Sequence, residues 1–305
     1  MKNEKAYIIT GPTSGIGYET ALELAKRGTV VLVGRNPEKL KQVEKVITDR
    51  GQNAVSVVCD ISDIKSVKRA AQQITELNLT ISGLLNNAGI MPQKATKNAQ
   101  GWDMTFATNY LGAFALTESL VPHLPDGANV VFIGSAIEDP ERKPAKIMGM
   151  KGGRYISAEA SARGEWKTGG SKMAGIDAYA TSKQCILVAA MAFARENTRL
   201  HFNVVEPCIM KGTTSLGSDG VNPFVHFLEA QMMKLIISFP PFNKYTSTPQ
   251  KAAKVITDVL INISGKTGIY FDEKGLPMIG SQLSRDKIFQ ERVFAETRAL
   301  LAKYN

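Results

Sequence analysis

Short apolar runs alternate with helix-like segments along nearly the whole chain, and this alternation limits the fold more than any other feature. Seven β-prone runs are predicted as strands, at residues 5–10, 29–34, 54–59, 81–85, 129–134, 201–206 and 268–271. Strands that alternate with helices pair in parallel, and the helices then cover both faces of the sheet. Because no repeat or linker interrupts the pattern, we predict an α/β fold with one domain over residues 1–305, built on a doubly wound parallel sheet of about seven strands with helices on both faces.

The composition is ordinary for a globular protein, with 44% hydrophobic and 21% charged residues. No window approaches about 18 uncharged apolar residues, so no membrane-spanning segment is predicted. The N-terminus passes directly into a strand-like run without a signal peptide. Cys59, Cys185 and Cys208 have neither disulfide-framework nor metal-ligand spacing. We therefore expect a cytoplasmic protein without a bound metal.

The formal net charge of +9 raises the question of nucleic-acid or membrane binding. Lys and Arg are scattered along the chain, however, without a long block of like charge or a recognised nucleic-acid motif. We therefore predict a solvated basic surface with a pocket for an anionic cofactor, and no nucleic-acid partner.

A glycine-rich turn follows the first predicted strand. It reads Gly11-x-x-x-Gly15-x-Gly17 and leads into an amphipathic helix that ends near Gly28. Glycines let a pyrophosphate approach the backbone, and the free N–H groups at the start of a helix attract its charge. The spacing differs from the common G-x-G-x-x-G fingerprint, and a plain loop is the alternative. The predicted cofactor contacts in this turn are Thr10, Gly11, Thr13, Ser14, Gly15, Ile16 and Gly17.

Arg35 directly follows the second predicted strand, where NAD-binding units carry an acidic residue for the ribose 2′-hydroxyl. An Arg suits a 2′-phosphate, so the sequence favours NADP(H) over NAD(H); the alternative is that Arg35 only caps the strand end. Asp60 ends the third strand, and Asn87-Ala88-Gly89 follow the fourth. The carboxyl ends of parallel strands form the ligand-binding edge of an open sheet, although Asn/Gly turns are also common there.

Tyr179 and Lys183 lie four positions apart in a helix predicted over about residues 179–197. Positions i and i+4 share one face of a helix, and an ammonium beside a phenol favours the phenolate and lowers its pKa. Such a phenol works as a general acid or base near neutral pH, whereas the alternative is an unrelated surface pair. The position of Asn109 also calls for an explanation, because it falls inside a helix predicted over residues 101–124, and Asn is unfavourable in a helix interior.

These motifs, in this order and on these elements, resemble those of the short-chain dehydrogenase/reductases. The resemblance rests on Thr10-Gly11-x-x-x-Gly15-x-Gly17, Asn87-Ala88-Gly89, Asn109, Ser135 at the end of the fifth strand, and Tyr179-x-x-x-Lys183. It covers nearly the whole chain. The resemblance implies a single Rossmann-like domain and hydride transfer with a nicotinamide cofactor.

The resemblance also implies a role for each matching residue. Tyr179 would be the general acid/base, and Lys183 would bind the nicotinamide ribose and lower the pKa of the Tyr. Ser135 would hydrogen-bond the reacting oxygen, and Asn109 would support a water relay to Lys183. The implied cofactor contacts beyond the glycine turn are Asp60 at the adenine and Asn87 at the adenosine ribose, together with Ile61, Ala88, Gly89, Pro207, Cys208 and Ile209.

The gap from Ser135 to Tyr179 is long for this family. With the run GGSKMAGIDAYATSKQC it looks most like the protochlorophyllide reductase and retinol-dehydrogenase-like branch. The usual Pro-Gly after the sixth strand is Pro207-Cys208 here, so the branch is inferred but not the substrate. An irregular insertion is expected over about residues 136–175, and a substrate-covering segment rich in Phe and Met over about 209–246.

The sequence thus predicts an NADP(H)-dependent oxidoreductase that acts on the carbonyl or alcohol of a bulky apolar small molecule, as a homodimer or a monomer. The alternatives are light-dependent C=C reduction of the protochlorophyllide type and a non-catalytic NADP-binding sensor or partner protein. The intact Ser135, Tyr179 and Lys183 count against a non-catalytic protein. Glu206, beside Pro207, either tunes the pocket or faces solvent.

Overall fold

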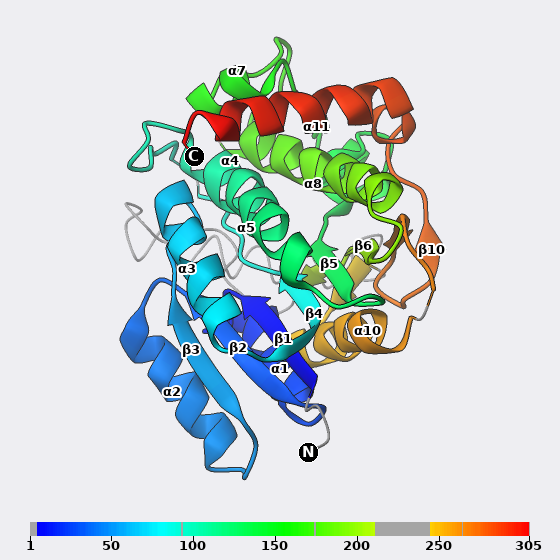
Figure 1. The fold of residues 1–305 in the computed structure, drawn as a ribbon. Coiled ribbons are helices and arrows are strands. Elements are labelled where there is room, and N and C mark those ends of the chain that lie inside the picture. The colour runs from blue at the N-terminus through cyan, green and yellow to red at the C-terminus, as the bar shows by residue number, and fades with distance from the viewer. Residues whose placement is uncertain (1–4, 93, 174, 211–244, 264, 305) are drawn as a thin grey trace, which may run out of the picture.

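The computed structural model describes residues 5–92, 94–173, 175–210, 245–263 and 265–304. Its main sheet has eight strands in the order β10-β9-β6-β5-β4-β1-β2-β3 (Figure 1). These strands are β1 (Lys5–Thr10), β2 (Thr29–Gly34), β3 (Ala54–Val58), β4 (Thr80–Asn86), β5 (Asn129–Ile133), β6 (His201–Val205), β9 (Ile269–Phe271) and β10 (Pro277–Met278). All neighbours pair in parallel except β10, which runs antiparallel to β9 at one edge. The predicted parallel sheet of about seven strands is therefore confirmed, with the short β10 added.

Helices cover both faces of this sheet, as predicted. They are α1 (Gly15–Ala25), α2 (Pro37–Thr48), α3 (Ile64–Glu76), α4 (Met104–Phe106), α5 (Gly112–Leu120), α6 (Lys143–Ile147), α7 (Ala158–Arg163), α8 (Ile176–Glu196), α10 (Pro249–Asn262) and α11 (Lys287–Ala302). Helices α1, α2 and α10 pack into the core on one face, and α3, α5 and α8 into the core on the other. Ile8 and Ile9 of β1 enter opposite cores, because successive side chains of a strand point to opposite faces.

Polar residues begin several of the helices at the expected places. The Asp63 side chain accepts a hydrogen bond from the backbone N–H of Lys65 at 3.1 Å and so caps the start of α3. Asn36 accepts in the same way from Lys39 at 2.9 Å, at the start of α2. Each cap satisfies one N–H group that the first turn of a helix leaves without a partner.

The insertion at residues 136–175 contains two short helices, α6 and α7, and is tied to the C-terminal helix. The Tyr155 hydroxyl donates a hydrogen bond to Glu296 at 2.7 Å. The same carboxylate oxygen accepts the backbone N–H of Ala158 at 3.0 Å. Two sites on the insertion are therefore held by one side chain of α11.

The predicted substrate-covering segment at 209–246 lies outside the described residues except at its ends. There β7 (Ile209–Met210) pairs in parallel with β8 (Thr246–Ser247). Over the part of the chain that the structure describes, no helix combines the length and the apolar character needed to cross a membrane.

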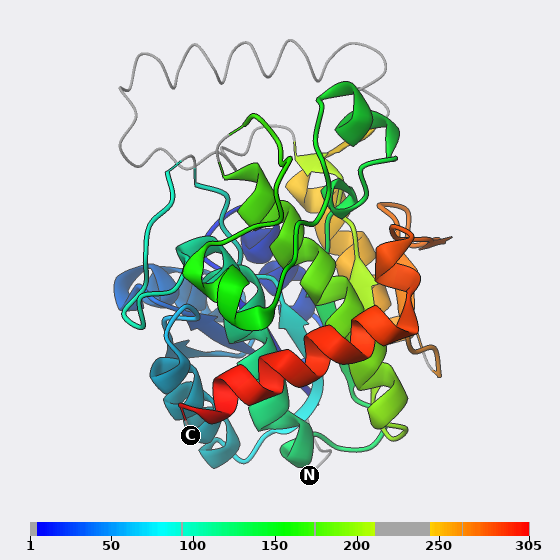
Figure 2. The same cartoon turned by 90° about the horizontal axis from the view of Figure 1, so that it is seen from above.

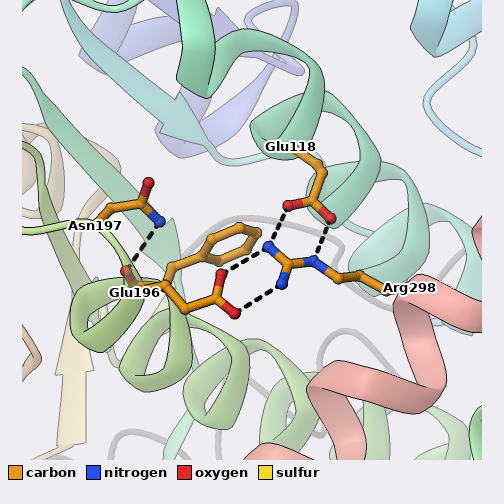
Figure 3. A network of polar contacts seen from close by, with 5 residues as sticks. Glu118, Glu196, Asn197 and Arg298 are labelled. Atoms are coloured by element: carbon orange, nitrogen blue, oxygen red, sulfur yellow. Dashed lines mark hydrogen bonds and ion pairs between the residues drawn. The ribbon is translucent and has the colours of Figure 1, made fainter.

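The C-terminal helix α11 has a buried face, although its sequence reads as largely polar. It packs on the outside of α8 (Figures 1 and 2). Its buried apolar side chains are Phe289, Val293, Phe294, Leu300 and Leu301. The guanidinium of Arg298 reaches two other helices (Figure 3), where it donates to both oxygens of Glu118 and to both oxygens of Glu196 at 2.7 to 2.8 Å. One side chain thereby joins α11 to α5 and α8.

Candidate active site

The glycine-rich turn joins β1 to α1 and leaves the start of α1 open to an anion. Gly11 and Gly15 have φ values of +68° and +55°, a region that glycine adopts without the penalty other residues incur. A Cβ on Gly17 would lie 2.1 Å from the carbonyl oxygen of Gly11. Ser14 precedes α1 but its side chain makes no capping hydrogen bond, and the first turn holds no acidic residue. The N–H groups and the dipole of α1 can therefore receive a phosphate.

Hydrogen bonds fasten this turn to the end of β4. The Thr10 hydroxyl accepts the backbone N–H groups of Asn87 and Ala88 at 3.0 and 2.9 Å. In return, Asn87 Nδ2 donates to the carbonyl oxygens of Thr10 and Gly11 at 2.8 and 3.2 Å. Asn87 therefore holds the two strand ends together, and its contact with a ribose stays a prediction.

The predicted adenine end of the site lies at β2 and β3. Arg35 follows β2 with an exposed side chain. The Asp60 carboxylate accepts the backbone N–H and the hydroxyl of Ser62 at 2.9 and 2.7 Å, which fixes the turn after β3. A cavity of about 310 Å³ opens between the glycine turn and α2, where Thr13 and Lys39 are among its lining residues.

Asn109 explains why a polar residue interrupts an apolar helix. The helix predicted over residues 101–124 is present from Met104 to His123 without a break, but it contains a π-helical turn, Ala107–Leu111, between α4 and α5. Within it, Asn109 Oδ1 accepts the N–H of Ile90 at 2.7 Å, and Nδ2 donates to the Ile90 carbonyl at 2.9 Å and to Ser182 Oγ at 3.1 Å. This buried amide therefore ties the loop after β4 to α8, and π-turns of this kind are frequent at functional sites.

Lys183 lies where β5, α8 and the loop after β4 meet. Its ammonium donates to the carbonyl oxygen of Ile133 at 2.8 Å, and the residue is only 3% exposed. The nitrogen is 5.5 Å from the centre of the Tyr179 ring. A Cβ on Gly89 would lie 3.7 Å from the same nitrogen and 3.4 Å from Asn109 Oδ1. The fold thus brings Lys183, Tyr179, Gly89 and Asn109 together.

Tyr179 is half-buried, and the Ser135 side chain hydrogen-bonds its phenol. Burial raises the pKa of Tyr179 to about 12. The charge of Glu206 also raises this pKa, whereas the hydrogen bond from Ser135 lowers it. Burial also lowers the pKa of Lys183 to about 8. The sequence predicts that Lys183 lowers the pKa of Tyr179, whereas in the structure desolvation sets the direction of both shifts, because it disfavours the charged form of each group.

The turn after β6 carries an unusual backbone at Cys208, whose φ is +69°. Left-handed geometry of this kind costs a non-glycine residue roughly 1–2 kcal/mol. The family resemblance leads us to expect Gly after Pro207, and Gly would avoid this cost. With Cys208 in its place, the turn bears the backbone penalty. Pro207 and Cys208 lie at the same sheet edge as Tyr179, whereas the side chain of Ile209 lies outside what the structure describes.

Glu206, which the sequence leaves either in the pocket or in solvent, is buried at the end of β6 and only 7% exposed. Burial raises the pKa of its carboxyl to about 7. One oxygen of Glu206, one of Glu273 and the sulfur of Cys208 lie within 4.8 Å of one another. One oxygen of the Glu206 carboxylate already accepts the backbone N–H of Cys208, and we assign no metal to this group. In the sequence, the position of Glu206 at the end of a strand was the only sign that it belongs to the site.

A second cavity of about 280 Å³ lies between the loop after β4 and the insertion. Apolar Trp166 and Met173 line it together with basic Lys97 and Arg163, and it reaches Ala178, the neighbour of Tyr179. Asp103 and Asp177 also line it, so the cavity offers apolar, basic and acidic side chains next to the start of α8.

Sequence comparison finds similar proteins among the dehydrogenases. A family model described as short chain dehydrogenase matches residues 5–143. Polyprenol dehydrogenase of Homo sapiens is 34% identical over 142 residues, which cover 44% of this chain and 43% of that protein. Retinol dehydrogenase 13 of Homo sapiens is 28% identical over 309 residues, covering 97% of this chain and 84% of that protein. The chain thus spans less than half of the first of these relatives and most of the second.

Solved structures share the fold. A short chain dehydrogenase from Burkholderia cenocepacia J2315, crystallised in complex with NADP, has a TM-score of 0.63 at 21% identity, covering 88% of this chain and 95% of that one. At this level of identity the likeness concerns the arrangement of the sheet and its helices.

Proposed function

The chain belongs to the short-chain dehydrogenase/reductase family, and on this premise we propose that it is an NADP(H)-dependent oxidoreductase that interconverts a carbonyl and an alcohol. The observation that carries the proposal is the convergence of Tyr179, Ser135 and Lys183 at one sheet edge, beside the open start of α1. A proton donor, a second hydroxyl and an anion cradle are the groups that carbonyl reduction requires.

The residues present fit a dinucleotide. Phosphates would be held at the start of α1, where the glycine turn admits them and no side chain caps the N–H groups. Arg35, exposed at the end of β2, would pair with a 2′-phosphate and so favour NADP(H). When bound, the nicotinamide would supply the hydride.

Two hydroxyl groups would then act on the reacting oxygen. As the carbonyl becomes an alkoxide, Ser135 would donate a hydrogen bond to it and Tyr179 would transfer a proton to it. The phenol of Tyr179 is protonated near neutral pH and can act as a proton donor, although a general acid works best when its pKa lies closer to the working pH. Lys183 would hold the nicotinamide ribose, and Asn109 would keep the neighbouring backbone in place for a water relay.

A bulky apolar alcohol or aldehyde is the substrate class we propose. The two curated relatives described above are named for polyprenol and retinol, which are both long apolar alcohols. Trp166 and Met173 in the cavity beside Ala178 provide apolar surface of the kind that such a chain would contact.

The test begins with binding. NADPH and NADH are titrated into wild type, Arg35→Ala and the control Lys45→Ala, whose exposed ammonium pairs only with Asp49 among the described residues. We expect tight NADPH binding that Arg35→Ala weakens by about tenfold or more, since a 2′-phosphate contact is a charge-assisted pair. Unchanged binding in Arg35→Ala would remove the argument for NADP(H).

Turnover is then measured with NADPH and a panel of long-chain aldehydes, in wild type and Tyr179→Phe. Loss of the phenol should lower kcat by about a hundredfold or more while cofactor affinity stays within about twofold. Cofactor binding without turnover of any aldehyde, together with no effect of Tyr179→Phe, would favour a non-catalytic NADP-binding protein.

Location and assembly belong to the same proposal. Cys59 and Cys185 are buried cysteines outside any disulfide, which suits the reducing cytoplasm that we propose for this protein. Whether it is a monomer or a homodimer is settled by sedimentation of the purified chain.

A further inference from the structure

Glu138 closes the short turn that begins at Ser135. Ser135 follows β5 and precedes a single 3₁₀ turn, Ala136–Glu138. The backbone N–H of Glu138 donates to the carbonyl oxygen of Ser135 at 3.3 Å. On the other side of Ser135, the N–H of Gly134 donates to the carbonyl oxygen of Val205 at 2.8 Å. The backbone around Ser135 is therefore fixed to β6 on one side and to Glu138 on the other.

The carboxylate of Glu138 is in turn held by the segment that precedes α11. Its Oε1 accepts the N–H of Ser281 at 2.8 Å. Its Oε2 accepts the hydroxyl groups of Ser281 and Ser284, each at 2.6 Å. All three residues are buried. Because three donors bind the two oxygens of one buried carboxylate, the side chain of Glu138 is held in one position.

Glycines let two other segments approach Glu138 closely. A Cβ on Gly280 would lie 3.0 Å from Oε1 of Glu138 and 2.5 Å from a methyl carbon of Leu187. A Cβ on Gly152 would lie 2.7 Å from the carbonyl oxygen of Glu138, and the N–H of Gly153 donates to that oxygen at 3.2 Å. The start of the insertion, its middle and the segment before α11 thus meet at Glu138.

The place of the Ser135 hydroxyl depends on this support. The hydroxyl does not cap the turn that follows it, which leaves it available to a reacting oxygen. A serine side chain has one heavy-atom torsion, so its hydroxyl moves with the backbone that carries it. A displacement of about 1 Å at a reacting group can lower a rate by about a hundredfold. Residues that fix the turn after Ser135 can therefore control turnover without contacting the substrate.

We propose that Glu138 is a positioning residue for Ser135, which ties the turn that carries this hydroxyl to Ser281 and Ser284 and thereby sets where the hydroxyl meets the reacting oxygen. This inference rests on the proposed function for its catalytic consequence. The hydrogen bonds that carry it are properties of the folded chain alone. They make the segment before α11 a support of the active site.

The variants weaken this support from both of its ends. Glu138→Gln replaces one of the accepting oxygens with an NH₂ group and keeps the backbone of the turn. Ser281→Ala removes one hydroxyl from the same carboxylate and keeps the Ser281 N–H. The control is Glu141→Gln, which removes an exposed ion pair with Lys146 in the same insertion. Each protein is assayed at a temperature at which circular dichroism shows it to be fully folded.

Turnover is measured with NADPH and a long-chain aldehyde. Glu138→Gln should lower kcat by about tenfold or more and Ser281→Ala by about threefold, while KM for the aldehyde and Kd for NADPH stay within about twofold. Glu141→Gln should leave kcat unchanged. A kcat of Glu138→Gln equal to that of wild type overturns the proposal.

The same substitutions are then made in Ser135→Ala, assayed at higher enzyme concentration. Without the hydroxyl, Glu138→Gln should lower kcat by less than about twofold, because the two changes act on one interaction. A merely structural role of Glu138 would lower kcat by the same factor in both backgrounds, and that result overturns the proposal.

Hydrogen–deuterium exchange gives a readout that needs no turnover. The N–H groups of Glu138 and Gly153 should exchange at least about fivefold faster in Glu138→Gln and Ser281→Ala than in wild type, with β1 unchanged. Unchanged exchange overturns the proposal, and Ser281→Ala carries the measurement if Glu138→Gln does not fold. If exchange rises but wild type reduces no aldehyde, the proposed function fails and the hold of Glu138 on the Ser135 turn stands. If wild type turns over and neither exchange nor kcat changes, the role of Glu138 fails and the proposed function stands.

Discussion

Glu138 and Ser281 are joined by two hydrogen bonds although they lie far apart in the chain. The Ser281 N–H donates to Oε1 of Glu138 at 2.8 Å, and its hydroxyl donates to Oε2 at 2.6 Å. The Ser284 hydroxyl donates to the same Oε2 at 2.6 Å, and Glu138 is only 1% exposed. Glu138 lies three positions after Ser135, so the segment before α11 anchors the start of the insertion beside the active site.

Replacing this buried carboxylate should cost stability. In Glu138→Gln one oxygen becomes an NH₂ group that faces hydroxyl donors, and we expect a loss of about 2–4 kcal/mol in the free energy of unfolding. Urea denaturation measures it. The control is Glu141→Gln, whose carboxylate makes an exposed ion pair with Lys146; it should change stability by less than about 0.5 kcal/mol. Equal effects of the two variants would contradict this role.

The same residue predicts a pH dependence of stability. Burial raises the pKa of Glu138 above its ordinary value of 4.5, although the three hydrogen bonds act in the opposite direction. The native protein therefore keeps this proton to higher pH than the unfolded chain does. Its contribution is fully present below pH 4.5 and is lost as pH rises through the native pKa. The stability difference between wild type and Glu138→Gln should shrink over that interval; a difference that grows with pH would contradict the assignment.

Gly17→Ala should abolish NADPH binding. The new Cβ would lie 2.1 Å from the carbonyl oxygen of Gly11 and 2.5 Å from Asn87 Nδ2, so the backbone of the glycine turn must move. We expect a stability loss of about 2 kcal/mol or more and no measurable binding by nicotinamide fluorescence. Gly51→Ala is the control, because Gly51 has a φ of +72° with no atom within 4 Å of the added Cβ. It should cost about 1 kcal/mol and leave binding intact.

Arg298→Ala should loosen the C-terminal helix without altering the active site. The side chain makes paired hydrogen bonds with Glu118 and Glu196 (Figure 3), and its guanidinium lies 4.3 Å from the centre of the Phe294 ring. We expect a loss of about 1–2 kcal/mol, measured by thermal unfolding and reduced at high salt. Arg163→Ala, which removes an exposed pair with Glu165, should cost less than about 0.5 kcal/mol. Identical melting curves for the two variants would show that the three-helix link contributes nothing.

Several parts of this structure could not be predicted from the sequence. The π-turn at Asn109 lies inside the predicted helix but could not be foreseen, because the partners of the amide on Ile90 and Ser182 are supplied only by the folded chain. The apolar face of α11 is covered by α8, and its scattered charges conceal it in the sequence. The role of Glu138 depends on Ser281 and Ser284, which are distant from it in the chain.

Local patterns in the chain specify the main strands and helices and the parallel direction of the strands, and they predict that Tyr179, Ser135 and the glycine turn meet at one edge of the sheet. The two-residue period of a strand and the 3.6-residue period of a helix are local properties of the sequence. A strand followed by a helix is compatible with few sheet topologies. The charges at that edge depend instead on how the segments pack. Whether Lys183 lowers the pKa of Tyr179, or burial raises it, depends on how much water the surrounding segments exclude and on where Glu206 points. Desolvation is a property of the packed neighbours, and no pattern along the chain records it.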